Sequence, residues 1–188
     1  GRLPLVKQAL TLLTGQLSAR DRISIVTYAG DTRVVLPSTS GEKKHDIRAA
    51  IDSLRAGGGT NGGAGIKLAY QQAQKGLLEG GINRILLATD GDVNLGLGHA
   101  QLTELVETSR ASGITLTTLG FGSGNYNDHL LEQLADLGNG NHAYIDSMSE
   151  ARKVLVTEMN ATLFTVASDV KLQVEFNPAV VAEYRLIG

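Results

Sequence analysis

The chain has 188 residues, of which 42% are hydrophobic and 19% charged, with a formal net charge of −2 and no cysteine. This length suits one well-buried domain and a piece of another. The near-neutral charge gives no electrostatic reason to expect nucleic acid or an anionic membrane as partner. No apolar run reaches the roughly 18 residues needed to span a bilayer. The lack of cysteine excludes disulfides, thiolate catalysis and Cys-ligated metal centres.

The lack of cysteine also bears on the compartment. It fits an oxidising environment, where an unpaired thiol is a liability, although many cytosolic proteins lack cysteine too. The sequence leaves the compartment open, and we favour the cell envelope or another extracytoplasmic location over the cytosol.

Helical and strand patterns alternate along the first half of the chain. Apolar residues recur at helical spacing, and β-branched runs such as RISIVTY contain no breaker. In chain order, the expected elements are a helix over 6–17, a buried strand over 22–28, a short edge strand over 33–36, helices over 47–54 and 66–77, and a strand over 83–89. Glycines cluster over 57–65, which indicates a backbone that turns tightly or approaches another group closely.

The alternation continues in the second half. The expected elements are a helix over 102–109, a strand over 114–119, a helix over 130–134, a short strand over 142–145, and a helix that opens at a capping box of Ser147 and Glu150. Strands separated by helices predict an α/β, doubly wound fold with a mostly parallel sheet covered on both faces. In such sheets ligands bind beyond the carboxyl ends of the strands.

The pattern changes after residue 165. Apolar and polar residues alternate over 170–176, and a second alternation over 183–186 follows Asn177-Pro178. This is typical of strands with one solvated face in an antiparallel sheet. We therefore divide the chain into an α/β domain over 1–165 and the start of a β-rich C-terminal domain over 166–188.

Two segments at the ends of expected elements carry oxygen ligands. Asp90 directly follows the strand that ends at Thr89, and Thr60 lies in the glycine cluster before a helix. Each has a structural explanation when taken alone, because Asp-Gly is common in turns and glycines flank helices. Together at one rim, however, a hydroxyl and a carboxylate are hard ligands that suit Mg²⁺, Mn²⁺ or Ca²⁺.

The segment GGGTNGGAGIKLAY, followed by NRILLATDGDVN, resembles the second and third elements of the metal-ion-dependent adhesion site (MIDAS) of von Willebrand factor type A (vWA) domains. The order of motifs resembles that family over residues 3–160. It is most similar to bacterial vWA proteins with a following domain of unknown function, the start of which VASDVKLQVEF resembles.

The resemblance implies a protein-binding module for adhesion or scaffolding, without enzymatic activity. It implies that Thr60 and Asp90 help to hold a divalent cation, and that a carboxylate from a protein partner completes the coordination shell. The residues expected to form the partner-binding rim around them are Gly59, Asn61, Gly91 and Asp92.

One element of the family pattern is missing. The motif D-x-S-x-S, which in the family ends a central first strand and supplies further ligands, does not occur in the sequence. Because hard cations need several oxygen ligands, we expect this chain to bind metal weakly or not at all. A missing central strand leaves two buried edges unpaired. We expect residues 169–176 or a strand exchanged from a neighbouring chain in a homo-oligomer to fill the gap, or the sheet to close up.

Two alternatives remain open. ILLATDGDVN also resembles the first motif of haloacid-dehalogenase-type phosphatases, in which Asp90 would be the nucleophile and Asp92 the general acid, with Mg²⁺ shared. That motif normally opens its domain, and the later lysine and acidic pair that this chemistry needs are not found at expected strand ends. The other alternative is a vWA-type fold that scaffolds an assembly without using a metal.

Overall fold

The computed structural model describes residues 2–56, 61–89, 98–122, 128–157, 167–168 and 170–176. Its helices are α1 (Leu3–Thr14), α2 (Lys44–Ser53), α3 (Gly62–Lys75), α4 (His99–Ala111), α5 (Asp128–Leu137) and α6 (Met148–Arg152), which a π-helical turn η1 (Lys153–Thr157) continues. Its strands are β1 (Arg22–Thr27), β2 (Arg33–Ser40), β3 (Ile82–Thr89), β4 (Ile114–Phe121), β5 (Asn139–Ile145), β6 (Ala167–Ser168) and β7 (Val170–Phe176).

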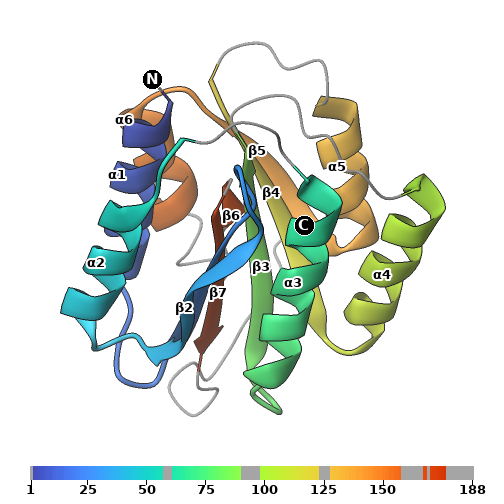
Figure 1. The fold of residues 1–188 in the computed structure, drawn as a ribbon, viewed down its shortest axis with the longest axis horizontal. Helices are drawn as coiled ribbons and strands as arrows, with labels where there is room; N and C mark the ends of the chain where they lie inside the picture. Colours follow the sequence, from blue (N-terminus) through green and yellow to red (C-terminus); the bar gives the residue numbers. More distant parts are fainter. Residues whose placement is uncertain are drawn as a thin grey trace.

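The strands form one sheet in the order β2-β1-β7-β6-β3-β4-β5 (Figure 1). Strands β3, β4 and β5 are parallel to one another. Strand β7 is antiparallel to both β1 and β3, so β1 and β3 run in the same direction. Strand β2 pairs antiparallel with β1 at the edge of the sheet. The predicted α/β, doubly wound fold is confirmed, with β2 and β7 as its antiparallel members.

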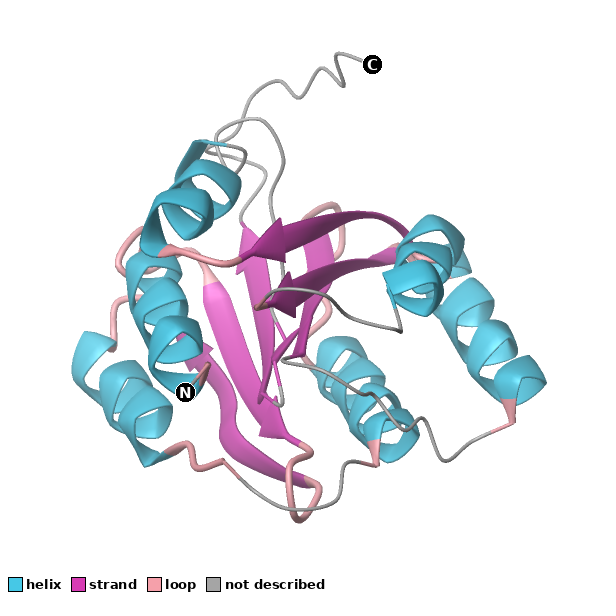
Figure 2. Ribbon diagram, turned by 90° about the horizontal axis from the view of Figure 1, so that it is seen from above, coloured by secondary structure: helices cyan, strands magenta, loops and turns pink. Residues whose placement is uncertain are grey.

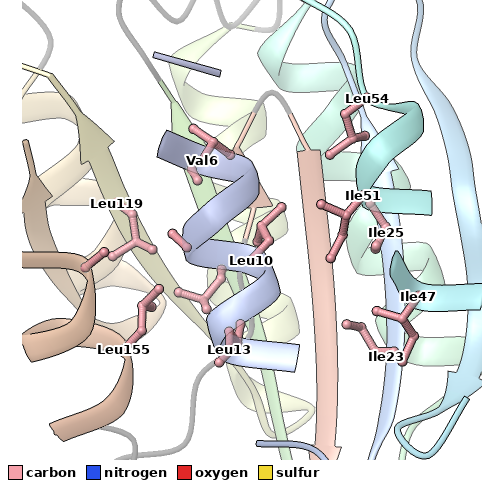
Figure 3. Packing of buried hydrophobic residues seen from close by; sticks show 14 of the residues in the cluster. Val6, Leu10, Leu13, Ile23, Ile25, Ile47, Ile51, Leu54, Leu119 and Leu155 are labelled. Atoms are coloured by element: carbon pink, nitrogen blue, oxygen red, sulfur yellow. The ribbon is translucent and has the colours of Figure 1, made fainter. Parts of the chain in front are cut away.

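Helices cover both faces of the sheet. Figure 2 shows α1, α2 and α6 on one side and α3, α4 and α5 on the other. Each side has its own buried cluster of apolar side chains. The first cluster, shown in Figure 3, joins α1 to β1, α2, β4 and η1 through residues that include Val6, Leu10, Leu13, Ile23, Ile25, Ile47, Ile51, Leu119 and Leu155.

Helix α1 illustrates why these residues form these elements. Val6, Leu10 and Leu13 recur at a spacing of three and four, so they lie on one face, and each is at most 1% exposed. Burying each of these side chains contributes about 1.5–3 kcal/mol. Pro4 lies in the first turn, where its missing N–H costs nothing. The apolar face therefore fixes how α1 packs on the sheet.

The end of β2 differs from the expected boundary, whereas the start of α6 agrees with it. Strand β2 continues to Ser40, beyond the expected end at residue 36, and includes Pro37. An edge strand tolerates proline because one side of it has no partner strand. Helix α6 begins as expected, since the Ser147 hydroxyl accepts a hydrogen bond from the Glu150 N–H at 3.2 Å.

The position between β1 and β3 is filled from within the chain. Strand β7 pairs with β1 over the whole of Arg22–Thr27 and with β3 over Ile82–Ala88. This is one of the three outcomes expected for the gap. The division of the chain at residue 165 stays a prediction, and the expected strand over 183–186 lies outside the described residues. Within the described ranges, no helix is both long and apolar enough to cross a membrane.

Candidate metal-binding rim

The carboxyl ends of β1, β3 and β4 meet at one edge of the sheet, which we call the rim. Thr27, the last residue of β1, and Ala88, next to the end of β3, pair with the same residue of β7. Thr89 pairs in turn with Gly120 near the end of β4. Ligands of open α/β sheets bind at such an edge, so the rim is where the predicted site residues are assessed.

Tyr28, which directly follows β1, ties three elements together at the rim. Its side chain is 1% exposed, and its hydroxyl donates a hydrogen bond to the carbonyl of Ala88 at 3.3 Å. Gly65, in the first turn of α3, lies against the same ring, and a Cβ built on Gly65 would lie 2.6 Å from the Cβ of Tyr28. The absence of a side chain at residue 65 thus lets the start of α3 reach the ends of β1 and β3.

Asn61 begins α3 at this rim. It is exposed, and its Oδ1 accepts a hydrogen bond from the Ala64 N–H at 3.1 Å, which caps the helix. The helix N-terminus carries a partial positive charge, which favours anions. The side-chain oxygen of Asn61 is thus engaged in the helix cap.

The other predicted site residues, Thr60 and Asp90 as ligands and Gly59, Gly91 and Asp92 around them, lie outside the described residues. The described residues next to them indicate where in the fold these segments begin. Asn61 and Thr89 are each one residue from a predicted ligand, and both lie at the rim. In the described part of the chain, no group of three or more histidine, aspartate or glutamate side chains could hold a metal ion. The ligand set itself stays a prediction.

Sequence reasoning missed two residues at the rim, Tyr28 and Arg2. Gly122, just after β4, has a φ of 104°, and the side chain of Arg2 lies against it where a Cβ would be. This places a guanidinium near the carboxyl end of β4. Tyr28 lies inside the strand expected over 22–28, whereas β1 ends at Thr27 and leaves Tyr28 at the rim. No local pattern predicts the second contact, since 120 positions separate the two residues.

A second polar cluster lies at the opposite end of the sheet, away from the rim. The buried carboxylate of Asp21 accepts hydrogen bonds from the Ser18 N–H at 2.7 Å and the Ser18 hydroxyl at 3.2 Å. Lys44 donates to the carbonyls of Thr14 and Leu17 at the end of α1. Burial raises the pKa of Asp21 and lowers the pKa of Lys44. These contacts join α1, β1 and α2, so we interpret the cluster as structural.

A groove among the described residues also lies away from the rim. It has a volume of about 600 Å³ and runs along the outer side of α1, between Asp52 of α2 and Met148 of α6. The Lys7 ammonium, which lines it, donates a hydrogen bond to the carbonyl of Asp52 at 2.9 Å. The groove is thus the seam between packed helices. The rim, where strand ends and a helix N-terminus converge, is the better candidate.

The doubly wound sheet defines the chain as an α/β domain, and comparison with known proteins identifies its class. The von Willebrand factor type A domain model matches residues 1–160. A second model, described as the C-terminal part of the uncharacterized protein YfbK, matches residues 161–188. The chain belongs to the von Willebrand factor type A domain family.

Two relatives are described as uncharacterized proteins. The chain is 59% identical over 188 residues to the protein YfbK of Escherichia coli K12, covering 100% of this chain and 33% of that protein. It is 33% identical over 146 residues to the protein sll0103 of Synechocystis, covering 78% of this chain and 34% of that protein. The chain therefore spans about a third of the length of these relatives.

Solved structures share the fold. A von Willebrand factor type A protein from Catenulispora acidiphila superposes with a TM-score of 0.71 at 19% identity, covering 87% of this chain and 38% of that one. The proximal thread matrix protein 1 of the mussel byssus, with a zinc-occupied MIDAS motif, superposes with a TM-score of 0.65 at 22% identity, covering 82% and 41%. At these identities the likeness establishes the fold alone.

Proposed function

We propose that the chain is the core of a protein-binding module that, in the intact protein, holds a divalent cation at the rim. Thr60 and Asp90 are the ligands retained in this sequence, and a carboxylate from the partner would complete the shell. The observation that carries the proposal is the position of their neighbours. Asn61 and Thr89 come from distant parts of the chain and both lie at the rim of a vWA-family domain.

The chemistry of the two side chains favours a hard cation. A threonine hydroxyl and an aspartate carboxylate suit Mg²⁺, Mn²⁺ or Ca²⁺. The zinc named for the mussel protein supports a divalent ion at this kind of site, and the choice of ion is part of the proposal. Two protein ligands are few for a hard cation, so we expect weak affinity in this chain by itself.

Titration of the 188-residue chain with Mn²⁺, followed by calorimetry, tests the proposal. We expect weak binding that Asp90→Asn abolishes and Thr60→Ala reduces. Asp136→Asn is a matched control, because Asp136 is an exposed aspartate on α5, away from the rim. Binding that is unaffected by Asp90→Asn would refute the assignment. Tight binding by this chain would contradict the argument that its ligand set is incomplete.

We infer a binding role in preference to catalysis. The strand that leads to Asp90 is β3, which follows three helices and two other strands, whereas the phosphatase motif normally opens its domain. Hydrolysis of a generic aryl phosphate that requires Mg²⁺ and is lost in Asp90→Asn would overturn this inference. If partners bind equally well after a chelator has removed divalent cations, the domain acts as a scaffold that uses no metal.

The location and the form of assembly are also proposals. The absence of cysteine supports an extracytoplasmic location, which fractionation of cells that express the native protein would check. Filling of the central strand position by a neighbouring chain would make the protein a strand-exchanged oligomer. Since β7 of the same chain fills this position in the structure, we expect a monomer in sedimentation experiments.

A further inference from the structure

A small pocket lies between the C-terminal end of α1 and the neighbouring helix α2, away from the rim. Its volume is about 230 Å³. It is lined by Thr11, Thr14 and Gly15 from the end of α1 and by Lys44, Arg48 and Ile51 from α2. Pockets for drug-sized ligands measure about 300–1,000 Å³, so this one suits a small ion or molecule.

The charged side chains that line this pocket are both cationic. Lys44 and Arg48 are one turn apart on α2, and like charges at this spacing repel each other. The lining includes no acidic residue. Because the whole chain has a net charge of −2, the positive charge here is a local feature. It favours an anion as the occupant of the pocket.

The structure holds Lys44 in a fixed position. Its ammonium donates hydrogen bonds to the carbonyls of Thr14 and Leu17, where the negative end of the α1 dipole favours a cation. The carboxylate of Asp21 attracts this ammonium but takes its hydrogen bonds from Ser18. An ammonium has three N–H donors, so one donor of Lys44 remains for a ligand.

Arg48, in contrast, has no partner that explains its position. It is exposed, and within the described residues its side chain forms neither an ion pair nor a hydrogen bond. Asp52 follows one turn later on α2, yet no ion pair joins the two residues in the structure. A guanidinium presents a planar fork of donors that matches the oxygens of a phosphate or carboxylate. Arg48 is therefore available to anchor an oxyanion.

Gly15 leaves one wall of the pocket bare. It is the C-cap residue of α1 and has a φ of −61°, which any residue can adopt. A Cβ at this position would meet no atom closer than 3.4 Å. Neither the backbone conformation nor the packing therefore requires glycine here, and its effect is to keep the pocket open.

We propose that this pocket binds a small tetrahedral oxyanion of the phosphate class, free in solution. Arg48 is the anchor and Lys44 the second donor. A phosphate ion has several acceptor oxygens, so it can bond to both cations at once and offset their repulsion. The site lies at the end of α1 and is independent of the metal site proposed at the rim.

Titration of the 188-residue chain with inorganic phosphate, followed by amide nuclear magnetic resonance, tests the proposal. Ionic strength is kept constant with chloride, so that general screening of charges does not change. We expect the amides of Gly15 and of residues 44–51 to shift along one saturable curve, whereas those of α4 stay unchanged. Shifts that do not saturate, or that are equally large on α4, would overturn the proposal.

Arg48→Gln removes the anchor and keeps a residue that favours helix. We expect it to weaken phosphate binding about tenfold or more, because charge-assisted hydrogen bonds are lost. Arg110→Gln is the matched control. Arg110 is an exposed arginine in the last turn of α4 and lines a groove that also contains Asp136, so its removal should leave the affinity unchanged. Unchanged affinity in Arg48→Gln, or an equal loss in both variants, would overturn the assignment.

A phosphate group carried by a larger molecule is the alternative source of the anion. A parallel titration with N-acetyl-phosphoserine amide distinguishes the two sources. We expect inorganic phosphate to bind at least as tightly, because the pocket is small. Binding of the phosphoserine compound that is about tenfold tighter or more, with extra contacts outside the pocket, would overturn the assignment to the free ion.

Discussion

Tyr28 and Gly65 show how a single residue pair sets the geometry of the rim. The tyrosine ring fills the space beside the first turn of α3, and its hydroxyl reaches the carbonyl of Ala88. Tyr28 lies outside the two segments that resemble the metal site, whereas Gly65 belongs to the first of them. Their contact nevertheless determines how close Asn61 lies to the end of β3, because it joins the first turn of α3 to β1.

Gly65→Ala is expected to destabilise the protein. A Cβ at residue 65 would lie 2.6 Å from the Cβ and 2.8 Å from the Cγ of Tyr28, which is buried. Overpacking of this kind costs about 1–3 kcal/mol of the free energy of unfolding, which urea denaturation measures. Gly15→Ala is the control. Gly15 has a helical φ of −61° and its Cβ position meets no atom closer than 3.4 Å, so we expect a small gain in stability. Equal effects of the two substitutions would contradict the packing argument.

Asp21 gives a prediction for pH. Burial raises its pKa above the ordinary value of 3.8, against the hydrogen bonds from Ser18 and the attraction of Lys44. The folded state therefore binds this proton more tightly than the unfolded state does. The resulting stabilisation is complete below pH 3.8 and is lost as the pH rises through the raised pKa of the folded state.

The measurement compares the free energy of unfolding of the parent chain with that of Asp21→Asn across this range. We expect the parent to lose stability relative to the variant as the pH rises. Ser18→Ala should steepen this dependence, because the hydroxyl of Ser18 is a donor that lowers the pKa of Asp21. A difference that stays constant or grows in favour of the parent would show that the hydrogen bonds outweigh burial.

The sequence predicts individual elements well where the signal is local. The spacing of Val6, Leu10 and Leu13 predicts α1, and the run that ends at Thr89 predicts β3, because side-chain periodicity follows directly from helix and strand geometry. The capping box at Ser147 is local in the same sense. Element boundaries that depend on neighbours were less accurate, as the extension of β2 through Pro37 shows.

Strand β7 shows the limit of local patterns. Its alternation correctly predicts a strand, but the same alternation is typical of a solvated sheet, whereas the structure places it in the interior. Its partners Ile25 and Leu86 are far from Leu172 in the sequence, and register over such separations is set by the whole sheet. The metal-ligand residues differ from β7 in this respect. The motif identifies Thr60 and Asp90 from the sequence, and the topology of a doubly wound sheet predicts that the ends of its strands meet at one edge.

The whole molecule is organised around a sheet that both apolar clusters share. Strand β3 contributes Leu86 to the first cluster and Ile85 and Leu87 to the second. The rim is therefore carried by strands that are anchored on both faces. If a ligand binds at the rim, we expect the accompanying changes to be concentrated in the loops, because these strands are held on both faces.

The shared sheet predicts that the two clusters unfold together. Loss of one cluster would expose a face of β3 while the other cluster still held it, which makes a half-folded state unfavourable. The chain has five tyrosines and no tryptophan, and a variant that keeps only Tyr28 and Tyr70 gives a fluorescence signal from the second cluster. Far-ultraviolet circular dichroism reports on the helices of both faces. We expect urea transitions followed by tyrosine fluorescence and by dichroism to share one midpoint and one slope. Separate midpoints would show that the two clusters unfold independently. The geometry of the rim would then not require both clusters to be intact.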